Sequence, residues 1–340
     1  MDEIIRKFSQ IKVGIIGDAI LDIFSYYSYE RPSREVAKTD IISFQTETVK
    51  PGGAANVAAN IVTLGGKSYL ITVMGKDFRS DDLMKTLIAN NINVLGIYDI
   101  DRPTSRKERI FRDGKLFVTL AKEKKKKISL AVIRQTIETL YKVSCDALII
   151  SDYGRGMICR ELLYEISQWA HEKQKRIFVD IRFTGFYDWR DLKNIYLAKP
   201  NIHDLLKFYK IPKGEASCEV VEKLSRKLVK EIDVHLLVTM GKKGMMLATR
   251  DGAIKYFNAQ TRTNDVVYVS GAGDAVIATV TLAQTAGATL EEATKLAVHA
   301  SGIAVKKPHT APVSQSELLQ EIAKFKTQIE IGDVINFKRK

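Results

Sequence analysis

Short apolar runs alternate along the chain with longer stretches whose hydrophobic positions recur at helical spacing. The first run, residues 11–17, is β-rich and ends in Gly17 and Asp18, which is typical of a buried strand. From Ser129 onward the alternation is regular. We expect helices near residues 129–142, 159–173, 216–230, 274–286, 290–305 and 316–327, and strands near residues 146–151, 176–180, 194–198, 234–239, 245–249 and 253–257. This order predicts an α/β fold, with a doubly wound, mainly parallel sheet and helices on both faces.

Two stretches, residues 23–49 and 97–120, have a different pattern, in which aromatic and β-branched residues alternate with polar ones. The second contains two such segments, 104–111 and 115–121, joined by a turn at Asp113-Gly114. Because this alternation is typical of strands with one exposed face, we expect a small β-sheet inserted into the main fold as a lid. A helix, a strand and a second helix are expected between the two stretches, near residues 56–64, 67–73 and 81–90.

The chain has no linker rich in Pro, Gly or Ser and no internal repeat, so we expect one domain over residues 1–330 and a basic tail over 331–340. Hydrophobic residues make up 45% and charged residues 27% of the sequence, which is typical of a globular protein with a sizeable core. We expect no membrane span, because no run of about eighteen apolar residues occurs. The polar N-terminus and three scattered cysteines, without paired spacing, predict a cytoplasmic protein with reduced thiols.

The formal net charge of +13 fits either a nucleic-acid surface or the attraction of anionic substrates such as ATP and sugar phosphates. The densest basic segment, Lys122–Lys127, has no interleaved aromatic residues and precedes an amphipathic helix. It is therefore better explained as a solvated loop, and we expect no nucleic-acid partner.

A glycine-rich segment at residues 269–278 places Gly271 and Gly273 on either side of Ala272, directly before Asp274 and a long apolar run. Small residues at the start of a helix leave backbone N–H groups free to bind an anion, and glycine lets a phosphate approach closely. Asp274 has two interpretations: a helix cap, or a general base beside an anion site. The segment alone leaves both open.

Other short polar residues and glycines also follow predicted strands, where open α/β sheets bind their ligands. They are Gly17-Asp18 with Asp22, Gly52-Gly53 with Asn56, residues 151–156, and Asn201 with Asp204. Asp18, Asp22 and Asn56 have side chains suited to the vicinal hydroxyls of a sugar. Each alone is equally well explained as a turn or cap residue. Together they indicate a polyol site facing an anion site.

Residues 51–58 and 269–274 resemble the two signatures of the ribokinase-like carbohydrate kinases. Within this family the chain is most similar to the D-glycero-D-manno-heptose-7-phosphate kinases of lipopolysaccharide precursor synthesis, often the N-terminal half of a bifunctional heptose kinase/adenylyltransferase. The closer similarity rests on Gly17-Asp18 with Leu21-Asp22, on the Ala-Ala-Asn at 54–56, and on residues 151–156, 198–201, 237–241 and 276–278. It covers about residues 11–320, with no second nucleotide motif after them, so no adenylyltransferase half is expected.

The resemblance implies ATP- and magnesium-dependent phosphorylation of the anomeric hydroxyl of a heptose 7-phosphate to the 1,7-bisphosphate. Asp274 would be the base, and Gly271, Ala272 and Gly273 the anion hole. Residues expected to hold the sugar phosphate are Asp18, Asp22, Gly52, Gly53, Asn56, Lys107, Arg109 and Asp152. Residues expected at the nucleotide are Arg182, Asn201, Asp204, Thr239, Gly241 and Gly244, with 299–310 near the adenine. Asp204 would hold Mg²⁺ through water, a monovalent cation is a further candidate, and the lid would form a homodimer interface.

The sequence departs from this family at several positions. Asp204 replaces the usual Glu, Arg182 stands where Lys is usual, and Tyr268 replaces an acidic residue. His309 replaces a Gly expected near the adenine, and residues 116–120 lack the usual Gln and Arg of the lid. Lys107 and Arg109 could instead be ordinary exposed strand cations. Two alternatives therefore stand beside the heptose kinase: a kinase for another sugar or sugar phosphate, and a non-catalytic sugar- or nucleotide-binding regulator.

Overall fold

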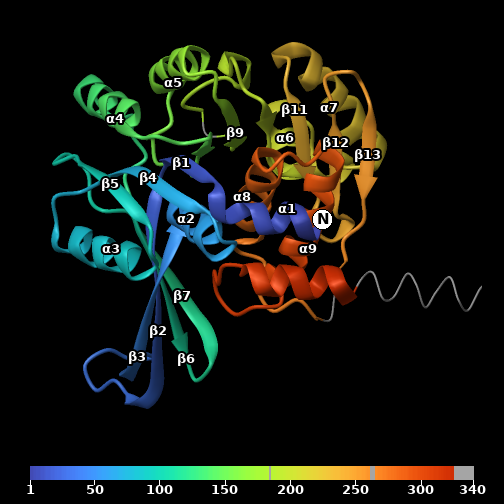
Figure 1. Cartoon of the computed structure of the whole chain (residues 1–340). Coiled ribbons are helices and arrows are strands. Elements are labelled where there is room, and N and C mark those ends of the chain that lie inside the picture. The colour runs from blue at the N-terminus through green and yellow to red at the C-terminus, as the bar shows by residue number, and fades with distance from the viewer. Residues whose placement is uncertain (184, 261–264, 325–340) are drawn as a thin grey trace, which may run out of the picture.

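The computed structural model describes residues 1–183, 185–260 and 265–324, which contain a main sheet and a smaller lid sheet (Figure 1). The main sheet has the order β13-β12-β11-β10-β9-β8-β1-β4-β5. Its strands are β1 (Lys12–Gly17), β4 (Lys67–Met74), β5 (Asn93–Tyr98), β8 (Ala147–Ser151), β9 (Arg176–Asp180), β10 (Leu197–Ala198), β11 (His235–Thr239), β12 (Met245–Ala248) and β13 (Ile254–Phe257). Along this order, neighbouring strands from β11 across to β5 run parallel. In the described part of the sheet, only β12 pairs antiparallel with its neighbours, β11 and β13, which confirms the predicted mainly parallel sheet.

Helices cover both faces of the main sheet, because its central strands are apolar on both sides. In β8, Ile149 packs into one core, whereas Leu148 and Ile150 pack into the other. The first core includes α1 (Asp2–Arg6), α2 (Ala54–Thr63), α3 (Phe78–Ala89), α8 (Ala272–Thr285) and α9 (Leu290–Val305). The second includes α4 (Leu130–Lys142), α5 (Arg160–Glu172), α6 (Ile202–Phe208) and α7 (Cys218–Ile232). The doubly wound architecture is therefore confirmed.

The lid sheet has the order β3-β2-β6-β7 and projects from the body of the molecule (Figure 1). Its strands are β2 (Ala19–Pro32), β3 (Asp40–Gly53), β6 (Arg106–Arg112) and β7 (Lys115–Lys122). They extend beyond the first expected segment, 23–49, because β2 starts directly after β1 and β3 runs into α2. Residues 93–98 belong instead to the main sheet as β5, so the lid strands of the second segment begin at Arg106 rather than at 97.

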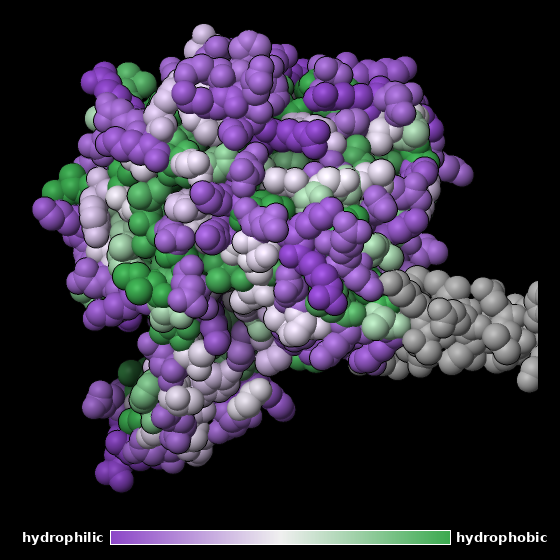
Figure 2. Space-filling model, viewed as in Figure 1, coloured by the Kyte–Doolittle hydropathy of each residue, from purple (hydrophilic) through white to green (hydrophobic). Residues whose placement is uncertain are grey.

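Most expected elements are present within two or three residues of their predicted ends. Among the α-helices and strands of the described residues, α1, α6 and the edge strand β5 were not predicted. Residues 315–324 are helical, while the expected end of that helix at 327 and the tail at 331–340 lie outside the described residues. No described helix combines the length and the apolar character that crossing a bilayer requires. In the view of Figure 2, hydrophobic residues are scattered among hydrophilic ones on both body and lid.

Candidate active site

The carboxyl ends of β1, β8 and β9 bring together residues that are far apart in the sequence. The register pairs Gly17 with Ser151 and Ser151 with Asp180. A Cβ at Gly17 would lie 2.1 Å from the Ser151 carbonyl oxygen, so only glycine allows this approach. Asp18 and Asp152, which directly follow β1 and β8, are consequently neighbours at one edge of the sheet.

Asp274 lies in the first turn of α8, which begins after Gly271 in a left-handed conformation (φ 91°). Its side chain does not cap the helix. Instead, Oδ2 accepts a hydrogen bond from Asn56 Nδ2 at 2.6 Å, and Oδ1 accepts one from the Tyr153 hydroxyl. Burial, together with the nearby charge of Asp180, raises the pKa of Asp274 to about 6, although both hydrogen bonds oppose the shift. A carboxylate with this pKa can accept a proton near neutral pH.

Two cations, buried Lys199 and half-buried Arg182, lie beside the start of α8. Lys199, 3% exposed, forms an ion pair with Asp180 Oδ1 at 2.8 Å, and its Nζ lies 3.3 Å from the position that a Cβ on Gly273 would occupy. Arg182 stacks its guanidinium on the Tyr153 ring at 4.3 Å, and its Nε is buried without a hydrogen-bond partner among the described residues. The glycine loop and these cations can together neutralise an anion. Lys199 was not predicted, although it directly follows β10 within the 198–201 motif.

The carboxylates of Asp18 and Asp152, both expected at the sugar, accept hydrogen bonds within the protein. The Asp18 carboxylate accepts the backbone N–H groups of Tyr153 at 3.0 Å, Arg155 at 3.1 Å and Met157 at 3.4 Å. Asp152 accepts the N–H of Gly154 at 2.7 Å and the hydroxyl of Tyr187 at 3.0 Å, and burial with the charge of Asp18 raises its pKa to about 7. Both carboxylates therefore organise the loop at 152–157, which carries Tyr153.

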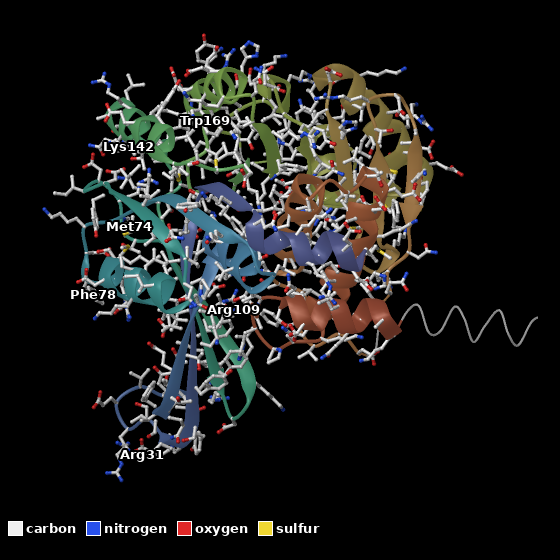
Figure 3. All side chains as sticks on the ribbon, viewed as in Figure 1. Arg31, Met74, Phe78, Arg109, Lys142 and Trp169 are labelled. Carbon is white, nitrogen blue, oxygen red and sulfur yellow. The ribbon has the colours of Figure 1, made fainter. Side chains whose placement is uncertain are left out.

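On the lid, Asp22 lies among cations. Its register partners are Lys50 on β3 and Lys107 on β6, so the three side chains share one face of the sheet. Arg109 Nη1 donates to Asp22 Oδ1 at 3.1 Å, and Arg109 is 6% exposed, so it is not a solvated strand cation. Figure 3 places Arg109 where the lid meets the body. Gly52 is required here, because its Cβ would lie 2.6 Å from Asp22 Oδ2. Lys50 was not predicted.

His309 and Tyr268 also face the lid. The His309 ring packs on Phe24 with centroids 4.0 Å apart, and its Nε2 is 2.9 Å from the hydroxyl of Tyr26. The Tyr268 ring lies 6.0 Å from the guanidinium of Arg109. His309 was expected near the adenine, whereas the structure places it against β2. Its φ of 62° explains why glycine is usual at this position.

The residues expected at the nucleotide follow β10 and β11. Asn201 caps α6, since its Oδ1 accepts the Asp204 N–H at 2.9 Å. Its Nδ2 also donates to Asp204 Oδ2 at 2.6 Å, and its backbone forms a β-bridge with Thr239. Gly241 and Gly244 both have positive φ, and a Cβ at Gly244 would lie 2.0 Å from the Phe257 carbonyl oxygen. The described residues contain no cluster of three metal-ligating side chains. A single carboxylate suits Mg²⁺, which keeps several waters and binds phosphate oxygens.

The sequence profile described as "pfkB family carbohydrate kinase" matches residues 11–317. Two proteins named Bifunctional protein HldE are similar: that of Vibrio parahaemolyticus serotype O3:K6 is 33% identical over 95% of this chain, and that of Sulfurimonas denitrificans is 30% identical over 93%. The chain spans 66% and 65% of their lengths, respectively. The resemblance inferred from residues 51–58 and 269–274 is thereby confirmed.

Solved structures show the same fold. Phosphofructokinase-2 from Escherichia coli in complex with potassium aligns with a TM-score of 0.76 at 19% identity, covering 93% of this chain and 99% of that chain. Ribokinase from Arabidopsis thaliana complexed with ribose and ATP aligns with a TM-score of 0.69 at 18% identity, covering 92% of this chain and 98% of that chain. The ribokinase-like fold, including its small second sheet, is confirmed.

Proposed function

Because this chain belongs to the pfkB family of carbohydrate kinases, we propose that it transfers the γ-phosphoryl group of ATP to the anomeric hydroxyl of a heptose 7-phosphate. The product is the 1,7-bisphosphate, a precursor for lipopolysaccharide. One observation carries the proposal: the buried Asp274 carboxylate lies at the glycine-initiated start of α8, with Asn56 bound to it. The similarity to the HldE proteins supports the heptose among the sugars that this family phosphorylates.

In the proposed reaction, the anomeric hydroxyl gives its proton to Asp274 as its oxygen bonds to the γ-phosphorus. The bond between that phosphorus and the oxygen of the departing ADP breaks. Backbone N–H groups of Gly271, Ala272 and Gly273 stabilise the charge on the transferring group, and Lys199 and Arg182 add two positive charges. This division leaves proton transfer to the carboxylate and charge neutralisation to the helix start.

The sugar hydroxyls are held by Asp22, Asn56 and the ends of β3 and α2 at Gly52 and Gly53. Asp18 and Asp152 also order the loop at 152–157, which carries Tyr153, because their carboxylates accept its backbone N–H groups. The distal phosphate binds to the cations around Asp22, which are Lys50, Lys107 and Arg109. Three cations around one carboxylate leave net positive charge, which favours a phosphorylated sugar over a neutral one.

The nucleotide lies over the ends of β10 and β11, against Asn201, Thr239, Gly241 and Gly244, with the part of the 299–310 segment that precedes His309 near the adenine. The ribokinase of Arabidopsis thaliana, which shares this fold, forms a complex with ribose and ATP, and this supports ATP as the phosphoryl donor. When bound, Mg²⁺ would be held by Asp204 through water and would neutralise phosphate charge. A monovalent cation remains a further candidate, and we place the reaction in the cytoplasm.

The lid is proposed to form a homodimer interface. Every residue of β7 is exposed, and Leu116, Phe117 and Leu120 are 56%, 56% and 50% exposed. An edge strand with unpaired backbone groups and large apolar side chains favours pairing with another protein surface. A second copy of the lid offers the same exposed strand, so a symmetric contact would cover both.

The test is a coupled ADP-release screen of heptose 7-phosphate against heptose, ribose, fructose and hexose phosphates. We expect turnover with heptose 7-phosphate and at least about tenfold lower kcat/KM for the sugars without a phosphate, since loss of one charged contact costs about that much. The hexose phosphates keep this contact and test whether the site prefers the heptose. Preferential turnover of another sugar would replace the heptose with that substrate. No turnover of any sugar would favour the non-catalytic regulator.

A further inference from the structure

Tyr153 is fixed at three points although it lies in a loop. Its backbone N–H donates to Asp18 Oδ2 at 3.0 Å, and the Arg182 guanidinium stacks on its ring at 4.3 Å. Its hydroxyl donates to Oδ1 of Asp274. A phenol held in this way loses little further freedom when it donates its hydrogen bond. The loop at 152–157 therefore presents one rigid donor to the carboxylate.

The other carboxylate oxygen of Asp274 accepts from Asn56 on α2 at 2.6 Å, so the two donors come from elements other than α8. Together they fix the plane of the carboxylate relative to the Gly271–Gly273 loop. We propose that Tyr153 is a positioning residue for Asp274, which orients the carboxylate and stabilises its charged form. The proposal rests on the proposed function only in that it takes Asp274 to be the base.

The charges around Asp274 show why such a donor matters. Burial and the carboxylate of Asp180 on β9 favour the neutral acid, whereas Arg182 and the two hydrogen bonds favour the carboxylate. Lys199, which lies beside Gly273, is already paired with Asp180. If the phenol hydroxyl is removed, Asn56 is left as the one side chain among the described residues that donates a hydrogen bond to Asp274. More of the base would then be protonated at neutral pH.

The direct test is a ¹³C NMR titration of the Asp274 carboxyl in the ligand-free protein, identified by its loss in Asp274→Asn. We expect Tyr153→Phe to raise the midpoint by about one pH unit, because the hydrogen bond from the phenol favours the charged carboxylate over the neutral acid. Tyr187→Phe is the matched control, since it removes a phenol that donates to Asp152 instead. It should leave the Asp274 midpoint in place.

A second variant keeps the hydroxyl and tests whether the shift in Tyr153→Phe comes from the lost hydrogen bond or from altered packing. Replacing Tyr153 by 3-fluorotyrosine makes the phenol a stronger donor, so the Asp274 midpoint should fall while the fold is retained. An unchanged midpoint in both Tyr153 variants would overturn the positioning role. A shift of equal size in Tyr187→Phe would also overturn it, by showing a general effect of losing a buried phenol.

Kinetics separate this inference from the proposed function. If the wild type turns over a sugar, Tyr153→Phe should lower kcat/KM about tenfold below pH 6 and by less than about twofold at pH 9. The reason is that the higher pKa of Asp274 leaves less of the base charged at acidic pH, whereas at pH 9 the base is charged in both proteins. Equal losses at both pH values would refute the proposed stabilisation of the charged carboxylate by Tyr153 and leave the kinase proposal intact. Absence of any turnover by the wild type would refute the proposed function, while the NMR titration would still decide the role of Tyr153.

Discussion

Replacing Gly52 by Ala adds one methyl group beside Asp22 and tests whether the lid side of the site needs the space that the glycine leaves. The new methyl would lie 2.6 Å from Oδ2 and 2.7 Å from Cγ of Asp22, well inside the distance of about 3.5 Å at which such atoms pack. The Asp22 carboxylate must therefore move, although Arg109 holds its other oxygen at 3.1 Å and both side chains are 7% exposed. Gly52 has no positive φ, so the effect is steric rather than conformational.

Overpacking of this kind costs about 1–3 kcal/mol, and a fully broken buried ion pair would cost about 3–5 kcal/mol. We expect the free energy of unfolding to fall by about 2 kcal/mol, or the thermal midpoint by roughly 4 °C. The KM for the sugar phosphate should rise about tenfold, whereas the KM for ATP should not change. Gly214→Ala is the control, because its methyl meets no atom within 4 Å. Equal stability and KM values in the two variants would refute the packing argument.

Further predictions concern the base, the phosphate contact and the interface. Asp274→Asn should lower kcat by about 10²–10⁴ while ATP binding, measured by calorimetry, persists; an active Asn variant would contradict the base assignment. Because the pKa of Asp274 is raised to about 6 in the folded protein, the protonated carboxyl stabilises the fold at pH values below the pKa of the unfolded chain, and this stability is lost as pH rises through 6. The stability of Asp274→Asn relative to the wild type should therefore increase between pH 4 and 7 in urea titrations. Lys50→Ala should raise KM about tenfold for sugar phosphates alone, with exposed Lys38→Ala as control; a parallel rise for neutral sugars would argue against a phosphate contact. Leu116→Lys should shift a dimer toward monomer in sedimentation, and an unchanged mass would place the interface elsewhere.

The main architecture could be predicted because its strands are continuously apolar and its helices carry strong periodicity. Residues 147–151 are buried on both faces, so they read as one uninterrupted run. The edge strand β5 could not be recognised in the same way, since its burial is interrupted along its length and its sequence, Asn93–Tyr98, contains a glycine. The α6 helix spans only 7 residues, which is too short for a periodic pattern to show.

The Gly-Ala-Gly-Asp segment allowed a helix start to be predicted, and α8 begins there, after Gly271. Pairings across elements were not predictable, because they depend on register. Lys50 looks like any strand lysine until its position opposite Asp22 is known. Asp18 and Asp152 have the right chemistry for a sugar, yet their oxygens accept hydrogen bonds from the loop at 152–157. Sequence spacing cannot distinguish a carboxylate facing solvent from one satisfied within the protein.

The way in which the helices begin gives a physical reason for the location of the site. In α3, α4, α7 and α9 a side chain accepts a first-turn N–H, from Asp77, Ser129, Ser217 and Thr289 respectively. By contrast, α2 and α8 begin after Gly53 and Gly271, both with positive φ and without a side-chain cap. A cap is worth about 1 kcal/mol, and α1 and α5 also forgo it, but among the described α-helices without a side-chain cap only α2 and α8 follow a glycine with positive φ. An asparagine from one and an aspartate from the other meet there at 2.6 Å. At α8 the glycine start therefore leaves N–H donors beside Asp274 for an anion, whereas at α2 the N–H of Ala54 donates to the Asp18 carbonyl oxygen and the helix contributes the Asn56 side chain instead.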